Sequence, residues 1–337
     1  MPPRVLIIRV GLLGDTVMAT HVIEPLRRHF GGKLRVDWVA KKGGAAKLLS
    51  LDARIGKIYP IAHRRWHWLA NPGQRALKYE SARHPYDALI NLEASDPCDG
   101  IARVAMAKEK YGRPFQIRPD DPRSHDVVQG REIVAPLVGD TLLRDSAPLF
   151  VPRQGVTEVR SELQGVNYAL VNPSFSHINR SGYRAHRAWP VSHWRELIGQ
   201  IKTELGLDIV INGAPGDHSV IEALLKLPGV HSIVGSPLSE LIGVLRNATC
   251  VVSVDTGVAH LAAALGTPTI TLFGPTDPGV TGPFQVSDSA RAISSQWHCS
   301  PCVNTARQRQ CQSNECMGRL FPERVFAELK QLVGNAV

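Results

Sequence analysis

The sequence predicts the α/β fold class, with two Rossmann-like domains facing a central cleft. Short apolar runs alternate with amphipathic stretches along most of the chain, which is the pattern of strand–helix–strand units and parallel sheets. The chain has 337 residues, and 43% of them are hydrophobic. That length exceeds one ordinary core and fits two domains of about 150 residues each. We expect a first domain over residues 1–155, a second over 156–320 and a final helical segment over 321–337.

The strands of the first domain are expected from four apolar runs. They cover residues 5–10, 34–39, 58–61 and 88–92. The stretch after Gly14 has the pattern of a crossover helix. The start of the chain lacks the apolar region and the cleavage site of a signal peptide, and no run approaches the roughly 18 apolar residues that span a bilayer. We therefore expect a cytoplasmic protein.

The second domain is expected to begin within residues 148–165. Its predicted strands cover residues 168–171, 208–211, 232–234, 250–254 and 269–273. A helix is predicted over residues 192–205. The last helix, predicted over residues 322–333, is amphipathic, and in two-domain folds of this kind such a helix often crosses back to the first domain.

The net charge of +9 lies entirely in the first half of the chain. Residues 1–155 carry 25 Lys and Arg against 16 Asp and Glu, whereas residues 156–337 carry 14 of each kind. This asymmetry predicts an anionic partner for the first half. Nucleic acid is not expected, because the sequence has no helix-turn-helix, zinc-finger or RNP pattern. An anionic lipid or a membrane surface fits the charge better.

The most informative segment, residues 250–284, contains the run DTGVAHLAAALGTPTITLFGPTDP. Where a strand passes into a helix at Asp255, Thr256 and Gly257, backbone N–H groups are left free, and such groups bind anions. Asp255 suits a helix cap, and Gly257 lets a ligand approach the backbone. In open α/β sheets, ligands bind at the carboxyl ends of the strands. The alternative is a capping Asp255 and a merely packed His260.

A second turn, RVGLLGDTV, ends the first predicted strand. Glycines such as Gly14 allow a tight turn against a ligand, and Asp15 stands at the start of the next helix. Asp15 is therefore either a helix cap or a carboxylate that faces the cleft. The turn is not a dinucleotide fingerprint, because it lacks the GxGxxG spacing.

Two polar loops follow strands of the second domain. The first covers residues 172–194, NPSFSHINRSGYRAHRAWPVSHW, with Ser174 in its opening turn. Its arginines can bind a phosphate bidentately, and a solvated basic loop is the alternative. The second loop, GAPGD, covers residues 213–217.

Together these motifs resemble glycosyltransferase family 9, the ADP-heptose lipopolysaccharide heptosyltransferases, and the resemblance covers nearly the whole chain. It implies the GT-B fold and an inverting transfer of heptose from an ADP-sugar donor. It also implies that Asp15 is the catalytic base and that Arg187, or Arg184 in its place, contacts the donor diphosphate. The residues expected to bind the donor are Ser174, Gly213, Asp217, Asp255, Thr256, Gly257 and His260.

Residues 63–68, HRRWHW, combine cations and aromatic rings inside the basic half. Arg and Trp suit a lipid headgroup layer or a phosphorylated sugar, and an exposed helix turn without a specific role is the alternative. The resemblance implies that Arg64, Arg65 and Trp66, together with Gly14, bind the acidic Kdo sugar of a lipid-linked acceptor. The protein is then peripheral at the cytoplasmic face of the inner membrane.

Four of the six cysteines, Cys299, Cys302, Cys311 and Cys316, lie close together in the sequence before the last helix. A CxxC pair with two further cysteines is a metal candidate, although the second spacing is irregular for a zinc ribbon. Structural zinc, reversible disulfides and reduced thiols all remain open. No cofactor is expected on the catalytic path, because no DxD-like pair accompanies the diphosphate site.

Other functions remain open on the residues alone. Another family 9 transferase would move a second heptose or a different core sugar. A nucleotide-sugar epimerase with the same architecture would need extra acid and base groups around the sugar rather than a basic acceptor face. A noncatalytic nucleotide-binding or membrane-scaffold protein would have no need of Asp15.

Overall fold

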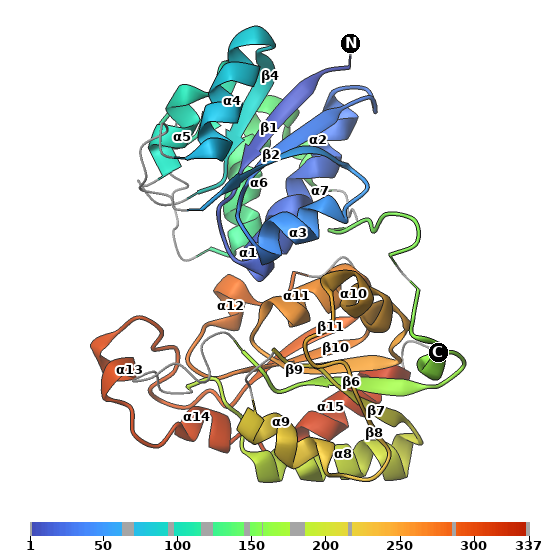
Figure 1. Cartoon of the computed structure of the whole chain (residues 1–337). Helices are drawn as coiled ribbons and strands as arrows, with labels where there is room; N and C mark the ends of the chain where they lie inside the picture. Colours follow the sequence, from blue (N-terminus) through green and yellow to red (C-terminus); the bar gives the residue numbers. More distant parts are fainter. Residues whose placement is uncertain are drawn as a thin grey trace. The chain divides into compact units, whose positions relative to one another are not determined.

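The computed structural model describes residues 2–62, 71–93, 98–115, 124–144, 149–156, 158–175, 186–214, 218–284 and 288–334. The chain divides into two compact units, Met1–Gln154 and Gly155–Val337. Each is an α/β unit with its own sheet (Figure 1). The division falls beside the boundary expected at residues 155 and 156.

The sheet of the first unit has β1 at its centre, and every pair of neighbouring strands is parallel. The strand order is β3-β2-β1-β4-β5. The strands are β1 (Arg4–Ile8), β2 (Arg35–Lys41), β3 (Ile55–Ile61), β4 (Tyr86–Asn91) and β5 (Ala107–Gly112).

Helices cover both faces of this sheet, so the central strands are apolar on both sides. They are α1 (Leu13–Ala19), the 3₁₀ turn η1 (Thr20–Val22), α2 (Ile23–His29), α3 (Gly44–Ser50), α4 (Pro72–Arg83), α5 (Asp99–Val104), α6 (Asp126–Val138) and α7 (Asp140–Arg144). On one face, Val5 and Ile7 of β1 pack with residues of α2 and α6. On the other, Leu6 and Ile8 pack with Leu77 of α4 and with residues of α5. The alternation of β1 side chains thus builds two cores around one strand.

The second unit has a six-stranded parallel sheet in the order β11-β10-β9-β6-β7-β8. Its strands are β6 (Tyr168–Asn172), β7 (Asp208–Ile211), β8 (Val230–Ser232), β9 (Cys250–Val254), β10 (Thr269–Phe273) and β11 (Ala290–Ser294). Its helical elements are η4 (Ser161–Leu163), α8 (Val191–Leu205), α9 (His218–Leu225), α10 (Leu238–Asn247), α11 (Gly257–Ala264), α12 (Pro278–Thr281), α13 (Ala306–Gln310), α14 (Glu315–Gly318) and α15 (Pro322–Gly334).

Helix α15 belongs to the second unit. Its buried residues Val325, Phe326, Leu329 and Leu332 lie in one core with the apolar residues of α8 and of β6, β9 and β10. In Figure 1 the helices α8, α9 and α15 lie together on one face of this sheet. The apolar face that suggested a helix crossing back to the first domain is thus buried within the second unit. No helix in the described ranges is long and apolar enough to cross a membrane.

Two of the four outer strands, β5 and β11, were not expected from the sequence. β5 reads AKEKYG, and edge strands of this kind carry charges in place of an apolar run. The first strand also ends earlier than predicted, at Ile8, because the Val10 N–H donates to the Glu93 side chain instead of the sheet. Likewise β8 covers Val230–Ser232 and not residues 232–234.

Candidate functional site

The strand order of the first unit places a switch point between β1 and β4, and ligands of open α/β sheets bind at the carboxyl ends of such strands. The chain adds β2 and β3 on one side of β1, then returns to add β4 and β5 on the other. At such a switch point the connections leave in opposite directions and open a crevice between them. The residues that follow β1 and β4, including Arg9 and Glu93, lie at this edge.

Asp15 lies at this edge in the first turn of α1, where its carboxylate is partly open to solvent. Its Oδ2 accepts a hydrogen bond from the Leu12 N–H at 2.6 Å. Its Oδ1 lies 3.6 Å from Nη2 of Arg9, and the side chain is 37% exposed. Leu12 is the N-cap residue and Asp15 is the third helical residue, so Asp15 does cap the helix start, from the N3 position of a capping box. Gly11 is required here, because a Cβ at this position would lie 2.4 Å from Cβ of Asp15.

Arg9 holds three elements together behind Asp15. Its Nη1 donates to the Leu92 carbonyl after β4 at 2.9 Å, and its Nη2 donates to Oδ2 of Asp126 at the start of α6 at 3.1 Å. The sequence analysis missed Arg9 and Asp126 as site residues, since their partners lie far along the chain. Nearby, burial lowers the pKa of His21 to about 3, so this histidine is neutral at neutral pH and adds no charge to the edge.

The switch point of the second unit lies between β6 and β9, and amide side chains organise it. Asn172 ends β6, and its Nδ2 donates to Oγ of Ser253 at 2.9 Å and to Oγ1 of Thr256 at 3.2 Å. Nδ2 of Asn212, after β7, donates to Oδ1 of Asn172 at 2.7 Å. These buried bonds join the ends of three strands to the start of α11. Asn172, Asn212 and Ser253 were also missed from sequence, because strand-end amides have no distinctive spacing.

Ser174 and Gly213 lie beside this network. Oγ of Ser174 accepts a hydrogen bond from the Ala214 N–H at 3.4 Å, which links the two loops. Gly213 is needed for packing, because a Cβ there would lie 2.0 Å from Cδ1 of Ile221. Their contact with a donor remains a prediction.

The N-terminus of α11 presents free backbone N–H groups at this edge. Thr256 is the N-cap residue, in an extended conformation, and its side chain makes no capping hydrogen bond. The first N–H groups of a helix have no partner within the helix, and the helix dipole makes this end positive. Thr256 and Gly257 are both partly exposed, so an anion can reach them. A diphosphate fits such a site.

Asp255 is not the cap that the sequence suggested. It is buried, and its Oδ2 accepts a hydrogen bond from Oγ1 of Thr276 at 2.6 Å. Arg187 donates from Nη1 to the Asp255 carbonyl at 3.0 Å, and its Nη2 lies 3.5 Å from Oδ2 of the same residue. Arg187 remains 32% exposed in its side chain, which leaves room for a second anionic partner. Thr276, which the sequence analysis did not single out, joins the loop after β10 to this cluster.

The remaining predicted site residues fall into two groups. His260 and Gly14 are buried, His260 within α11 and Gly14 within α1. Five others lie outside the described residues, and their roles stay predictions: Arg64, Arg65, Trp66, Arg184 and Asp217.

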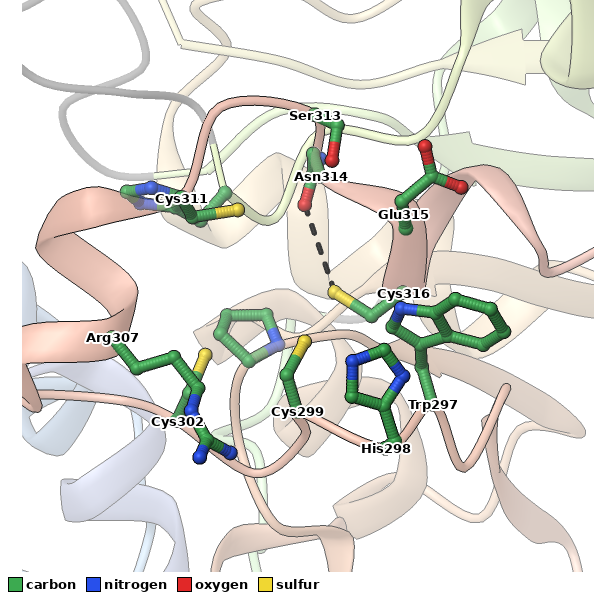
Figure 2. Close-up of a pocket in the computed structure, with 12 residues that line it drawn as sticks. Trp297, His298, Cys299, Cys302, Arg307, Cys311, Ser313, Asn314, Glu315 and Cys316 are labelled. Atoms are coloured by element: carbon green, nitrogen blue, oxygen red, sulfur yellow. Dashed lines mark hydrogen bonds between the residues drawn. The ribbon is translucent and has the colours of Figure 1, made fainter.

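The four clustered cysteines line one cavity of about 260 Å³ (Figure 2). Cys299, Cys302, Cys311 and Cys316 form no disulfide within the described residues. Burial raises the pKa of the Cys316 thiol to about 11, and it raises the pKa of Cys302 as well. Among the described residues, no three His, Cys, Asp or Glu side chains lie in positions that could hold a metal ion without rearrangement.

Known proteins share both the sequence and the fold. Residues 115–312 match the model of glycosyltransferase family 9 (heptosyltransferase). Lipopolysaccharide heptosyltransferase 1 of Escherichia coli K12 is 29% identical, over 83% of this chain and 91% of its own. Lipopolysaccharide heptosyltransferase 1 of Pseudomonas aeruginosa is 25% identical over 98% of both chains.

Solved structures agree with the α/β fold of GT-B type predicted from the sequence. The Escherichia coli heptosyltransferase WaaC, solved with ADP, matches 98% of this chain and 99% of its own with a TM-score of 0.76, at 24% identity. A family 9 glycosyltransferase from Veillonella parvula matches 99% of this chain and 97% of its own with a TM-score of 0.75, at 16% identity. The predicted fold class is confirmed.

Proposed function

The chain belongs to glycosyltransferase family 9, the heptosyltransferases, and on that premise we propose that it transfers a heptose from ADP-heptose to the Kdo region of the lipopolysaccharide inner core. Relatives named lipopolysaccharide heptosyltransferase 1, which are 25–29% identical over 83–98% of this chain, support this choice within the family. A transferase that adds the second heptose is the runner-up, because such enzymes also match.

The observation that carries the proposal is the site at the switch point of the second unit. The free N–H groups at the start of α11 follow Asp255 in the chain, and the partly exposed guanidinium of Arg187 donates to the Asp255 carbonyl. Backbone N–H groups and a fork of guanidinium donors are the usual means of binding a diphosphate. The same groups stabilise the negative charge that develops on ADP as it leaves, so no proton donor is needed for the leaving group.

Asp15 is proposed as the general base at the edge of the first unit. A sugar hydroxyl is a poor nucleophile, and a carboxylate within hydrogen-bond reach accelerates its attack by taking the proton as the bond forms. The acceptor oxygen then bonds to the anomeric carbon while the bond from that carbon to the diphosphate oxygen breaks. The proton ends on Asp15 and the electron pair on ADP. A single displacement of this kind inverts the anomeric centre.

The Leu12 N–H and Arg9 suit Asp15 to this task. Together they fix the carboxylate in one orientation, and its 37% exposure leaves one side open to a hydroxyl. Because Arg9 is itself held by the Leu92 carbonyl and by Asp126, the base is supported by β4 and α6 as well as by its own helix.

The acceptor is proposed to bind the first half of the chain. All of the +9 net charge lies there, and a Kdo-bearing lipid is strongly anionic. Arg64, Arg65 and Trp66 are the residues proposed to contact it. The same charge supports peripheral binding at the anionic cytoplasmic face of the inner membrane.

A donor and acceptor panel tests the proposal. The purified protein is incubated with ADP-heptose, ADP-glucose, UDP-glucose or UDP-N-acetylglucosamine. Each donor is combined with Kdo-lipid A or with its heptosylated product as the acceptor. The masses of the lipid products are then measured by mass spectrometry. We expect one heptosyl unit to be added only from ADP-heptose and only to Kdo-lipid A. Transfer only to the heptosylated acceptor would assign the second-heptose activity instead, and no heptose transfer to either acceptor would contradict the proposal.

A further inference from the structure

Two short segments that carry the clustered cysteines face each other across the cavity described above. The first cysteine segment, residues 299–302, carries Cys299 and Cys302, and the second, residues 311–316, carries Cys311 and Cys316. In Figure 2 the four sulfur atoms point into the space between the segments. Cys302 and Cys316 are buried, and the other two are partly exposed. No other group of four thiols exists in this chain, which has six cysteines in all.

Four sulfur atoms around one space are a ligand set for a soft metal ion. Tetrahedral sites of four cysteine sulfurs hold Zn²⁺ or iron, and a CxxC turn commonly supplies two of the ligands. The cavity has room for an ion, and the thiols need to move inward to about 2.3 Å from it. Cys299, Cys302 and Cys311 lie in loops and Cys316 lies in the single turn of α14, so none of the four thiols is on a strand of the sheet.

The first cysteine segment is attached to the loop that holds Asp255. The N–H groups of Cys302 and Val303 both donate to the Pro275 carbonyl, at 2.8 and 2.9 Å. The hydroxyl of Ser300 donates to the Gly274 carbonyl. Pro275 directly precedes Thr276, whose hydroxyl donates to the Asp255 carboxylate. A shift of the first cysteine segment therefore moves a partner of Asp255.

The second cysteine segment is attached to the loop that carries Arg187. Nδ2 of Asn314 donates to the Ala188 carbonyl at 2.9 Å, and Ala188 directly follows Arg187. Cys316 and Met317 pack against Gly274, where a Cβ would lie 2.6 Å from Sδ of Met317 and 3.3 Å from Sγ of Cys316. The second segment thus contacts the Arg187 side and the Gly274 side of the donor site together.

We propose that Cys299, Cys302, Cys311 and Cys316 bind one thiophilic metal ion, Zn²⁺ or Fe²⁺, which joins the two cysteine segments and so fixes Arg187 and Thr276 around Asp255. In this proposal the ion takes no part in the transfer reaction. It positions the residues that bind the donor diphosphate. The metal site rests on the cysteines alone. Its effect on the donor rests on the proposed function, because that function makes Arg187 a diphosphate ligand.

Metal content tests the first part without any activity measurement. The full chain is purified under reducing conditions and analysed for zinc and iron by mass spectrometry. We expect about one ion per chain, and loss of that ion in Cys302→Ser and in Cys311→Ser. Ser313→Ala is the matched control, since Ser313 lines the same cavity and is no ligand for a soft metal.

The wild-type protein supplies a second readout that does not depend on how the variants fold. After chelation of the native ion, added Co²⁺ should give the intense visible absorption of a tetrahedral thiolate complex. Absence of bound metal in the purified protein and of this absorption after Co²⁺ addition would overturn the metal site. Intact-mass spectrometry gives a further check. A protein that holds no metal and has lost two hydrogen atoms for each pair of cysteines contains disulfides, and this result would also overturn the metal site.

Calorimetry with ADP tests the second part. Removal of the ion should weaken ADP binding by about tenfold, and added Zn²⁺ should restore it, while the far-ultraviolet circular dichroism stays the same. Equal ADP affinity with and without the ion would overturn the link to the donor site. Bound metal and metal-dependent ADP affinity in a protein that fails to transfer heptose would contradict the proposed function and support the metal proposal.

Discussion

Asp15 in the first unit and Asp255 in the second occupy comparable places with different surroundings. Each follows a strand that borders a switch point, and each has a carboxylate oxygen about 3.5 Å from an arginine, at 3.6 Å from Arg9 and 3.5 Å from Arg187. The side chain of Asp15 is 37% exposed, whereas that of Asp255 is 8% exposed. Asp15 accepts one bond from a backbone N–H, and Asp255 accepts one from a threonine hydroxyl.

This difference shows that an aspartate–arginine pair does not by itself reveal a role. The exposed carboxylate has room for a substrate hydroxyl and can take its proton. The buried carboxylate of Asp255 already interacts with Thr276 and Arg187, so it links the loops that carry these two residues. Asp15 therefore suits the reaction, and Asp255 suits the construction of the donor site.

The largest effect is expected on the transfer rate when Asp15 is replaced. In Asp15→Asn the amide oxygen can still accept from the Leu12 N–H, but the base is lost. Transfer should fall by roughly a hundredfold or more, which corresponds to about 2.7 kcal/mol, while the affinity for ADP stays near that of wild type. Initial rates of ADP release and ADP calorimetry measure both quantities. A variant that turns over at nearly the wild-type rate would remove Asp15 from the mechanism.

A smaller effect, on stability, is expected at Asp255. Asp255→Ala leaves the Thr276 hydroxyl without its acceptor and removes the carboxylate near Arg187, which keeps only the backbone carbonyl, so unfolding of the second unit in urea should require about 2 kcal/mol less free energy. Asp277→Ala is the control. Asp277 follows Thr276 in the loop after β10, and its side chain accepts a hydrogen bond from the exposed Gly279 N–H. That variant should lose at most about 1 kcal/mol. Equal losses in the two variants would mean that Asp255 is an ordinary loop residue.

Thr276 should show a smaller effect still. Thr276→Val keeps the side-chain shape and removes the hydroxyl that donates to Asp255. We expect ADP binding to weaken by roughly fivefold, about 1 kcal/mol, because the loop and Arg187 are held less firmly. Calorimetry on Thr281→Val serves for comparison, since that hydroxyl bonds only within α12. If Thr281→Val weakens ADP binding as much as Thr276→Val, the Asp255 cluster is not what positions the donor.

The least effect at ordinary ionic strength is expected on the acceptor side. Replacement of Arg64 and Arg65 with Ala should raise the apparent KM for the Kdo-lipid acceptor a few-fold and flatten its salt dependence, with the donor KM nearly unchanged. Lys33→Ala with Arg83→Ala removes the same charge from two exposed positions in the same half. An identical response of both double variants would indicate a general charge effect instead of a binding site.

The sequence predicted the second unit's site better than the first unit's. β9 and α11 follow from an unbroken apolar run and a small-residue helix, so the free N–H groups at Thr256 and Gly257 were expected. The cap was misassigned by one residue, because Asp and Thr both suit that position and only the extended backbone at Thr256 decides between them.

Contacts between distant segments were beyond the sequence. Arg9 meets Asp126 across 117 positions, and Arg187 meets Asp255 across 68. Such pairs depend on strand order, which local patterns do not determine. The outer strands β5 and β11 were missed for a related reason: a strand with one neighbour needs no apolar run on both faces.

The central proposal is that one exposed carboxylate, Asp15, is the base of a single displacement at the anomeric carbon of the donor. The anomeric configuration of the product tests it most directly. Nuclear magnetic resonance of the one-bond C1–H1 coupling in ADP-heptose and in the heptosylated lipid gives the configuration before and after transfer. The account predicts opposite anomers. The same anomer in donor and product would require a second displacement through a covalent intermediate, and it would contradict the role assigned to Asp15.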